Sequence, residues 1–357
     1  MNYREITLRE AIHFKNGKKR PTSEGNIPVY GGNGVLGYAG ESNYEHCIII
    51  GRVGAYCGSV YLEEGKCWVS DNAIAAVPSG DNDTKFFYYL LKGLHLNERH
   101  IGTSQPLLTQ EILNKINCEV PSYPDQQRIA ELLSSLDRKI NVNRKLNDNL
   151  AGLLQTIYQE RFSNDILAVN QGVLSDICSY SRDKVAVSEL NVSTYFSTEN
   201  MLSGKAGSTE ATSLPTTSQT TACHKGDTLI SNIRPYFKKI VYCEGNCGCS
   251  TDVLCFTPSQ PRYSTYLFST LYADKFFAFM VAGSKGTKMP RGDKQQIMTY
   301  PVVLPSEEEL ARFNTIASPL LEQIYSNRAE NKRLSILRDT LLPKLMSGEI
   351  DVSAVQL

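Results

Sequence analysis

The chain has 357 residues, and its 37 basic and 37 acidic side chains give a formal net charge of zero at pH 7. A balanced charge neither requires nor excludes nucleic acid, so any basic footprint must be local. No stretch approaches 18 apolar residues and the N-terminus lacks an apolar signal region, so we expect neither a membrane span nor a secretory signal. The ten cysteines are therefore predicted to be reduced thiols in a cytoplasmic protein.

The chain contains one module twice. A first block recurs at an offset of 180 residues, and matches further along recur at an offset of 184. The first block pairs Tyr56, Val60, Glu64, Cys67, Ser70 and Pro78 with Tyr236, Ile240, Glu244, Cys247, Ser250 and Pro258. The later matches pair Gly102, Pro106, Arg128, Asn143 and Asn147 with Gly286, Pro290, Arg312, Asn327 and Asn331. Two copies of one module predict a pseudo-twofold axis, and duplex DNA has twofold symmetry of its own.

Each copy is predicted to be a mixed domain followed by one long helix. Residues 46–52 (HCIIIGR) and 227–234 (DTLISNIR) are predicted to form buried strands, and prolines interrupt the chain before each helix. The predicted fold is α/β (α+β), with two pseudo-symmetric globular domains separated by two long helices that form an antiparallel coiled coil. The predicted bounds are 1–123 for the first domain, 124–162 for the first long helix, 163–305 for the second domain, 306–347 for the second long helix and 348–357 for a C-terminal tail.

Both long helices carry a heptad seam, because apolar and Asn side chains recur in alternating steps of four and three residues. Asn143 with Asn147, and Asn327 with Asn331, interrupt the two seams at matching places, and an Asn in a seam fixes register and partner choice. Antiparallel pairing of the helices satisfies the pseudo-twofold axis; the alternative is that each helix packs only on its own domain. The predicted interface consists of Ile129, Leu133, Leu136, Ile140, Asn143, Asn147, Leu150, Leu154, Ile157, Phe313, Leu320, Ile324, Asn327, Asn331, Leu334 and Leu341.

Several strings in the two globular regions are typical of one protein family. In the first copy they are IPVYGGNGVLGY at residues 27–38 and IIIGR at residues 48–52. In the second copy they are YFSTENM at residues 195–201, SNIRPYFKK at residues 231–239 and STDVL at residues 250–254. The strings of the two copies resemble different subtypes of recognition domain.

The start of the first long helix fits the same family. PDQQRI at residues 124–129 matches the beginning of the family's helix, whereas EELAR at residues 308–312 departs from that pattern in the second copy. Over essentially its whole length the chain resembles the DNA-specificity subunit of Type I restriction-modification systems. The resemblance implies a non-enzymatic subunit that reads a bipartite, asymmetric site in double-stranded DNA, with one half-site per domain and the gap set by the helix pair.

The resemblance also implies partners and cofactors. In this family the helices dock two modification subunits, which bind S-adenosylmethionine and methylate adenine. Restriction subunits with ATP-driven translocase and nuclease activity join that core. We therefore expect no cofactor in this chain, and we expect S-adenosylmethionine, ATP and Mg on the partner subunits.

The sequence lacks the motifs that would let the chain act alone. It has no Pro-Pro, so the Asn-Pro-Pro-aromatic motif of an adenine methyltransferase is missing, and it has no P-loop. Cys243, Cys247 and Cys249 cluster, but their spacing is not a usual zinc set, so no metal is expected. The alternative function is a coiled-coil scaffold whose two domains bind protein. DNA affinity that falls steeply with salt separates the two functions.

Basic and polar loop residues are the predicted DNA contacts. A run of cations near the N-terminus suits phosphates, although a solvated loop has the same composition. Arg52 and Arg234 end the predicted buried strands, and Arg is the side chain best shaped for O6 and N7 of guanine; a structural ion pair is the alternative. The loop around Lys288 is cationic only in the second copy, as expected if the copies share a scaffold and differ in what they read. The full predicted set is Lys15, Lys18, Lys19, Arg20, Asn33, Arg52, Thr103, Arg234, Tyr236, Lys238, Lys239, Lys285, Lys288 and Arg291.

Overall fold

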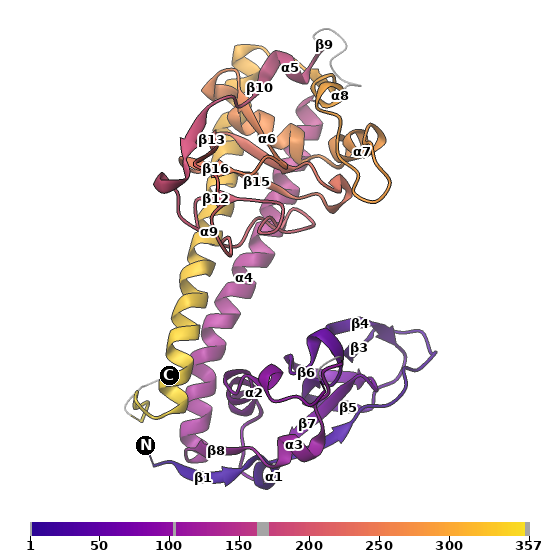
Figure 1. Cartoon of the computed structure of the whole chain (residues 1–357), viewed down its shortest axis with the longest axis vertical. Helices are drawn as coiled ribbons and strands as arrows, with labels where there is room; N and C mark the ends of the chain where they lie inside the picture. Colours follow the sequence, from indigo (N-terminus) through magenta and orange to yellow (C-terminus); the bar gives the residue numbers. More distant parts are fainter. Residues whose placement is uncertain (1, 103–104, 163–170, 354–357) are drawn as a thin grey trace. The chain divides into compact units, whose positions relative to one another are not determined.

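The structure, a computed structural model, describes residues 2–102, 105–162 and 171–353 (Figure 1). The chain divides into two compact units. Unit 1 comprises Met1–Val142 with Glu330–Leu357, and unit 2 comprises Asn143–Ala329. Since the two long helices are α4 (Tyr123–Phe162) and α9 (Glu307–Met346), each of them contributes one part to each unit.

Unit 1 is built on a six-stranded sheet in the order β2-β7-β5-β6-β3-β4, with a separate antiparallel pair of β1 and β8. The central strand β5 is buried on both faces. Ile48 and Ile50 pack in a core with Phe86 and Phe87 of α2, while Ile49 belongs to a smaller core on the other face. The elements are β1 (Arg4–Thr7), α1 (Leu8–Ala11), β2 (Ile12–Asn16), β3 (Ile27–Gly31), β4 (Gly34–Ala39), β5 (Tyr44–Gly51), β6 (Val60–Val69), β7 (Ala73–Pro78), α2 (Thr84–Gly93), α3 (Gln110–Asn114) and β8 (Asn117–Val120).

Unit 2 contains two four-stranded sheets, β10-β17-β14-β15 and β11-β13-β16-β12, and an antiparallel pair of β18 and β9. Its central strand β14 follows the same rule as β5, because Ile230 packs in one core and Leu229 in another. The strands are β9 (Gln171–Val173), β10 (Cys178–Tyr180), β11 (Lys184–Ala186), β12 (Tyr195–Phe196), β13 (Gln219–Cys223), β14 (Thr228–Ser231), β15 (Ile240–Tyr242), β16 (Cys247–Cys249), β17 (Val253–Pro258) and β18 (Pro301–Val303). The short helices are α5 (Leu174–Ile177), α6 (Ser264–Tyr272), α7 (Asp274–Ala282) and α8 (Lys294–Met298).

The long helices run antiparallel within each unit. In unit 2, Nδ2 of Asn327 donates to Oδ1 of Asn147 at 2.8 Å, so two seam amides satisfy each other across the pair. In unit 1, Nδ2 of Asn331 donates to the carbonyl of Ile140 at 3.3 Å. Residues later in α4 therefore contact residues earlier in α9. The predicted fold class, two α/β domains with an antiparallel pair of long helices, is confirmed.

The predicted seam residues are all buried or partly buried. Towards the globular regions the seam merges with the domain cores: Ile129 and Leu133 lie in the core of unit 1, and Phe313 lies in that of unit 2. The sequence analysis missed Leu321 and Leu345, which are 2% and 0% exposed. None of the described helices is long and apolar enough to cross a membrane.

Candidate nucleic-acid interface

In both units a buried central strand ends at a one-turn 3-10 helix. After β5 this turn is Gly54–Tyr56, and after β14 it is Pro235–Phe237. The same backbone hydrogen bonds hold the two turns. Cys57 N donates to Gly54 O at 3.0 Å, and Phe237 N donates to Arg234 O at 3.0 Å. The module seen in the sequence is therefore also one local structure, built twice.

A loop from further along the chain crosses each turn. In unit 1 Leu107, which pairs with Ile101, forms a bridge with Val53. In unit 2 Arg291, which pairs with Lys285, forms a bridge with Ile233. Gly54 N donates to Pro106 O at 3.0 Å, and Arg234 N donates to Pro290 O at 2.8 Å. Each unit thus brings a strand-end turn and a crossing loop together at one place.

Arg52 and Arg234, which each end a predicted buried strand, do not occupy equivalent positions in the two units. Arg52 N donates to Asn72 O at 3.0 Å, and the equivalent bond in unit 2 runs from Asn232 N to Asp252 O at 2.8 Å. Arg52 therefore corresponds to Asn232, and Arg234 corresponds to Gly54. The reason is that β14 ends at Ser231, so Arg234 lies three residues beyond its strand, whereas Arg52 follows Gly51 of β5 directly.

In unit 1 the turn between β3 and β4 packs against the strand-end turn. A Cβ added at Gly32 would lie 3.7 Å from Cα of Gly51, so the neighbouring Asn33, which is exposed, lies close to the end of β5. Arg52 is partly buried; its Nη1 donates to Asp71 O at 3.4 Å, and its Nε is buried without a partner in the described part of the chain. Thr103 lies outside the described residues.

The predicted basic run near the N-terminus does not form one patch. Lys15 lies on β2, at one edge of the six-stranded sheet. The guanidinium of Arg20 packs against Gly37 of β4, at the opposite edge. Lys18 bridges to Ser70 between them, and Lys19 follows it with an exposed side chain. Phosphate contact by all four side chains would therefore have to span the width of the sheet.

In unit 2 several predicted cations already have partners. Lys238 and Lys205 each place Nζ 2.8 Å from Oδ1 of Asp274. These hydrogen bonds hold the pKa of Asp274 at about 2. Lys239 donates to the carbonyl of Thr198, and burial lowers its pKa.

The crossing loop of unit 2 carries three more predicted cations. Lys285 pairs with Asp293, and Arg291 places Nη2 3.2 Å from Oδ1 of Asp252. By contrast, Arg234 and Lys288 form no ion pair within the residues that the structure covers. Arg234 is partly buried and its Nε has no hydrogen-bond partner there. Among the cations predicted to contact DNA in unit 2, these two are the ones without an ion pair or side-chain hydrogen bond in the described part of the chain.

Exposed aromatic side chains accompany both turns. Tyr56 and Tyr236 are each 50% exposed, and the ring centroids of Tyr236 and Phe237 lie 4.8 Å apart. The sequence analysis selected Tyr236 and missed Tyr56, although the repeat aligns the two. In unit 1 the edge strand β4 also exposes Val35, Leu36 and Tyr38, which lie in the family-typical string at residues 27–38.

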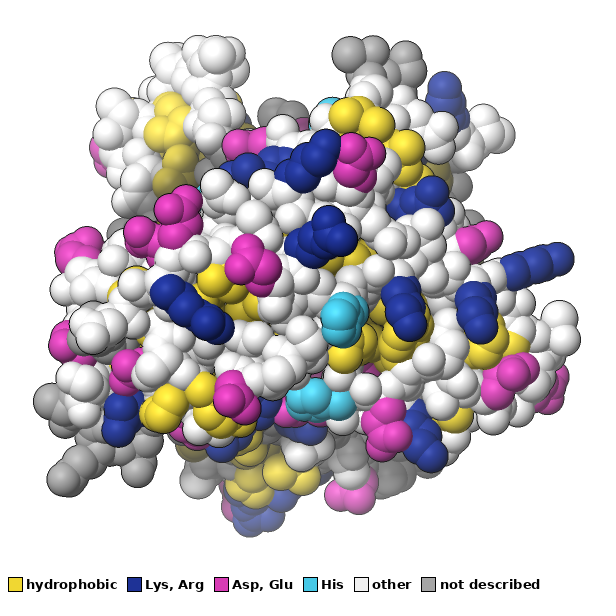
Figure 2. Space-filling view, turned by 90° about the horizontal axis from the view of Figure 1, so that it is seen from below, with side chains coloured by type: hydrophobic (Ala, Val, Ile, Leu, Met, Phe, Trp, Pro, Cys, Tyr) yellow, Lys and Arg dark blue, Asp and Glu magenta, His cyan; other side chains and the backbone are white. Residues whose placement is uncertain are grey.

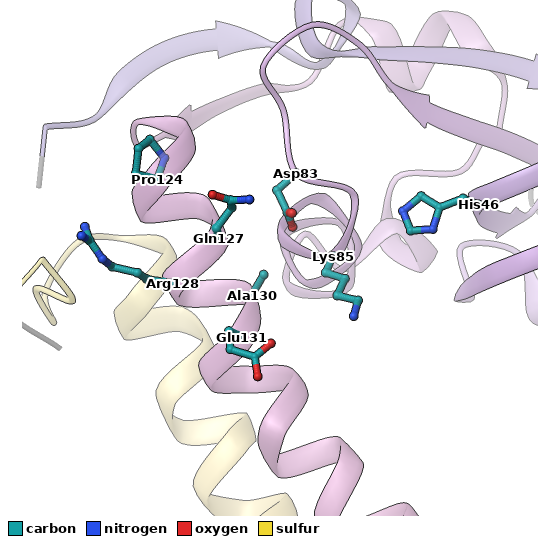
Figure 3. Close-up of a pocket in the computed structure, with 8 residues that line it drawn as sticks. All are labelled: His46, Asp83, Lys85, Pro124, Gln127, Arg128, Ala130 and Glu131. Carbon is teal, nitrogen blue, oxygen red and sulfur yellow. The ribbon is translucent and has the colours of Figure 1, made fainter. Parts of the chain in front are cut away.

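Basic and acidic side chains are interspersed over the face shown in Figure 2, without a large field of one sign. Unit 1 also contains a cavity of about 490 Å³ between the starts of α2 and α4, drawn in Figure 3. It is lined by His46, Asp83, Lys85, Pro124, Gln127, Arg128, Ala130 and Glu131. None of the predicted DNA-binding residues lines this cavity, so it is separate from the strand-end turn.

The cysteines are buried free thiols. Sγ of Cys247 lies 3.5 Å from Sγ of Cys243, inside a small core of unit 2. Within the described ranges no group of three or more His, Cys, Asp or Glu side chains could hold a metal ion. Burial raises the pKa of Cys178, which is a structural thiol in the larger core.

Fold and site together define a two-unit α/β protein that presents the same strand-end turn twice, beside an antiparallel helix pair. Residues 2–151 match the family model described as the Type I restriction modification DNA specificity domain. The resemblance inferred from the sequence is thereby confirmed: the chain is similar to the DNA-specificity subunits of Type I restriction-modification systems.

Two specificity subunits illustrate how far the likeness extends. That of Type I restriction enzyme EcoprrI from Escherichia coli is 31% identical over 116 residues, which are 32% of this chain and 29% of that subunit. That of MjaIX from Methanocaldococcus jannaschii is 23% identical over 340 residues, covering 77% of this chain and 71% of that subunit. The chain thus matches less than a third of the first relative's length. The S subunit of a Type-I restriction-modification system from M. genitalium has the same fold, with a TM-score of 0.60 at 19% identity over 97% of this chain and 96% of that one.

Proposed function

We propose that the chain is the non-catalytic DNA-recognition subunit of a Type I restriction-modification complex. Each unit reads one half of a bipartite, asymmetric site in double-stranded DNA. The observation that carries this proposal is the strand-end turn with its crossing loop, which both units hold by matching backbone hydrogen bonds while the side chains differ. A shared scaffold with different contact residues is what two different half-sites require.

The contact chemistry of unit 2 supports base reading by Arg234. An unpaired guanidinium can donate two parallel hydrogen bonds to O6 and N7 of guanine, worth about 1 to 3 kcal/mol of discrimination against other bases. Lys288 and Lys238 carry charge at exposed or partly exposed places and suit phosphates. In unit 1 the corresponding surface combines Asn33 and Arg52 with Lys18, Lys19 and Arg20 of the basic run.

The helix pair has two roles in the proposal. It sets the gap between the two half-sites, because α4 and α9 each continue from one unit into the other. It also docks two modification subunits, which supply S-adenosylmethionine and methylate adenine, and restriction subunits with ATP and Mg join them. The complex acts in the cytoplasm, where it meets the host's DNA.

Methylation by the purified complex tests this function. The chain together with its modification partner should methylate adenine at a two-part site found by sequencing methylated host DNA, and the chain alone should methylate nothing. Its DNA affinity should fall steeply between about 50 and 200 mM salt, as counterion release requires. A chain that binds no duplex and captures only protein would instead be the coiled-coil scaffold.

The role of the helices in spacing has its own test. Four residues inserted near Lys145 would lengthen α4 by about 6 Å, equivalent to one or two base pairs at about 3.4 Å each. The methylated motif should keep both half-sites and lengthen only its gap. The same insertion at Gly80, an exposed position with open space around it, is the control and should leave the gap unchanged. A motif with altered bases and an unchanged gap would contradict this role.

A further inference from the structure

We infer that residues 54–58 of unit 1 and residues 234–238 of unit 2 are two versions of one DNA-contacting turn, in which unit 2 carries cations at backbone positions that unit 1 keeps as glycine. The inference rests on the proposed function and assigns its contact residues. It adds Gly54, Tyr56 and Gly58 to the predicted site of unit 1. It also divides each turn into a shared part and a part that differs.

Hydrogen bonds establish that the positions are equivalent. Gly54 accepts from the residue three places on and donates to Pro106 O of the crossing loop, and Arg234 does the same with Phe237 and Pro290. One step further, Gly51 N donates to Ser59 O at 2.8 Å, and Ser231 N donates to Lys239 O at 3.2 Å. The intervening residues correspond without a gap, so Gly58 matches Lys238.

The backbone is left-handed at both positions in both units. The φ angles are +73° at Gly54 and +85° at Gly58. They are +50° at Arg234 and +51° at Lys238, where the side chain makes this conformation unfavourable. Glycine adopts it without steric cost, so the sequence of unit 2 is locally strained at two places where unit 1 is relaxed.

Contacts within the protein do not account for the two cations. Arg234 has no ion pair in the described part of the chain, and its Nε is buried without a partner. Lys238 pairs with Asp274, but the two side chains are 39% and 69% exposed, and exposed pairs contribute little to stability. Because contacts within the protein do not offset the backbone strain at Arg234 and Lys238, we attribute the strain to ligand binding. Phosphates and guanine edges are the ligands that match these two side chains.

The tyrosine in the middle of each turn is the shared part. Tyr56 and Tyr236 have the same exposed fraction, 50%. Because the two units read different bases, a residue common to both suits a contact that carries no sequence information, such as a phosphate or sugar. In unit 1 a Cβ added at Gly54 would meet no described atom within 4 Å, so the backbone there is open to DNA, whereas Gly58 packs against the protein. A Cβ at Gly58 would lie 2.3 Å from Asn97 N, so this version of the turn has no room for a lysine.

Two substitutions at one position separate side chain from backbone. Arg234→Ala and Arg234→Gly both remove the guanidinium, so in complex with the modification partner both should lose about tenfold in affinity for the methylated target. They should differ in stability: Gly relieves the left-handed strain and Ala keeps it, so the Gly variant should be about two- to fivefold more favoured in its folding equilibrium. In the interior of a helix or strand, by contrast, a Gly variant is less stable than an Ala variant.

His95 is the matched control. It has a φ of +48°, lies exposed in unit 1, and belongs to neither turn. His95→Gly should likewise be more stable than His95→Ala, and both should bind DNA as the wild type does. Tyr56→Ala should weaken binding to the target duplex and to unrelated duplexes by the same factor, and so should Tyr236→Ala.

The outcomes distinguish this inference from the proposed function. If the wild-type complex binds its target and both Arg234 variants bind it as tightly as the wild type, the inference is wrong and the proposed function stands. The inference is also wrong if Arg234→Gly is less stable than Arg234→Ala, or if Tyr56→Ala changes base preference. A wild-type complex that binds no duplex overturns both.

Discussion

The two units hold their strand-end turns with the same backbone hydrogen bonds, yet unit 1 places glycine where unit 2 places Arg234 and Lys238. Main-chain bonds to the crossing loop fix the geometry of the turn in both. Side chains at the turn are therefore free to differ, even at the cost of local strain. In this module, therefore, main-chain groups specify the scaffold and side chains specify the contact chemistry.

The units also differ in how their globular parts are fastened to the helices. In unit 1, Tyr89 Oη donates to Asp137 of α4 at 2.7 Å, and Arg338 of α9 pairs with the same carboxylate. In unit 2 an aromatic contact stands at this place: Tyr325 of α9 accepts from Tyr242 N at 2.6 Å and lies under the guanidinium of Arg328. Unit 1 thus uses a charged network, and unit 2 uses a ring with a part-buried hydrogen bond beside other polar contacts, such as Gln155 of α4 with Ser269 O.

The largest expected effect breaks the network of unit 1. Asp137→Ala leaves Tyr89 and one side of Arg338 without a partner, and should cost about 2 to 3 kcal/mol because the pair is mostly shielded from solvent. Chemical denaturation measures this cost. Asp339→Ala removes the exposed partner on the other side of Arg338 and should cost under about 0.5 kcal/mol. Equal costs for the two variants would contradict the network.

The second prediction concerns the two glycines of the strand-end turn in unit 1. Gly58→Ala in unit 1 adds left-handed strain and a clash with Asn97 N, so it should cost about 2 to 3 kcal/mol. Gly54→Ala adds only the strain, since nothing lies within 4 Å of the new methyl group, and should cost about 1 kcal/mol. If the thermal midpoints of the two variants agree, the close approach at Gly58 does not exist.

The third prediction concerns the fastening of unit 2. Tyr325→Phe leaves Tyr242 N buried without an acceptor, and should cost about 1 to 2 kcal/mol in denaturant unfolding. Tyr236→Phe, at a half-exposed ring, is the control and should change the free energy of unfolding by less than about 0.5 kcal/mol. A Tyr325→Phe variant as stable as the control would show that this bond does not hold unit 2 on its helix.

The smallest expected effect depends on pH. The pKa of Asp274 is lowered to about 2 by hydrogen bonds from Lys205 and Lys238, so its contribution is present above the ordinary value of 3.8 and is lost as pH falls towards 2. Because the carboxylate is largely exposed, the contribution is at most a few tenths of a kcal/mol. The difference in unfolding midpoint between wild type and Asp274→Asn should shrink over that interval. A difference that stays constant would contradict the pairing.

The architecture was predictable because periodic side chains report it directly. The repeat and the heptad seams with paired Asn143, Asn147, Asn327 and Asn331 led to the two domains and the antiparallel helices, a fold class that is confirmed. The contact geometry was not predictable to the same degree. Asp274 and Thr198, the partners of Lys238 and Lys239, lie far from them in the sequence.

The offset of 180 residues that aligns Tyr56 with Tyr236 also aligns Gly54 with Arg234, and the hydrogen bonds to the crossing loops agree with that alignment. Tyr56 could therefore have been selected from the sequence. The end of each strand could not, because both arginines follow an apolar run although β14 stops at Ser231 while β5 continues to Gly51. The assignment of DNA contacts remains a prediction.

Binding of the complex to its methylated target, with one half-site scrambled at a time, tests whether unit 2 reads its half-site through Arg234. Wild type should lose affinity when either half is scrambled. For Arg234→Ala, scrambling of one half should cost about tenfold less affinity than it costs the wild type, and scrambling of the other half should cost as much as in the wild type. If wild type and Arg234→Ala respond equally to scrambling of each half, unit 2 does not read its half-site through this turn, and the account is contradicted.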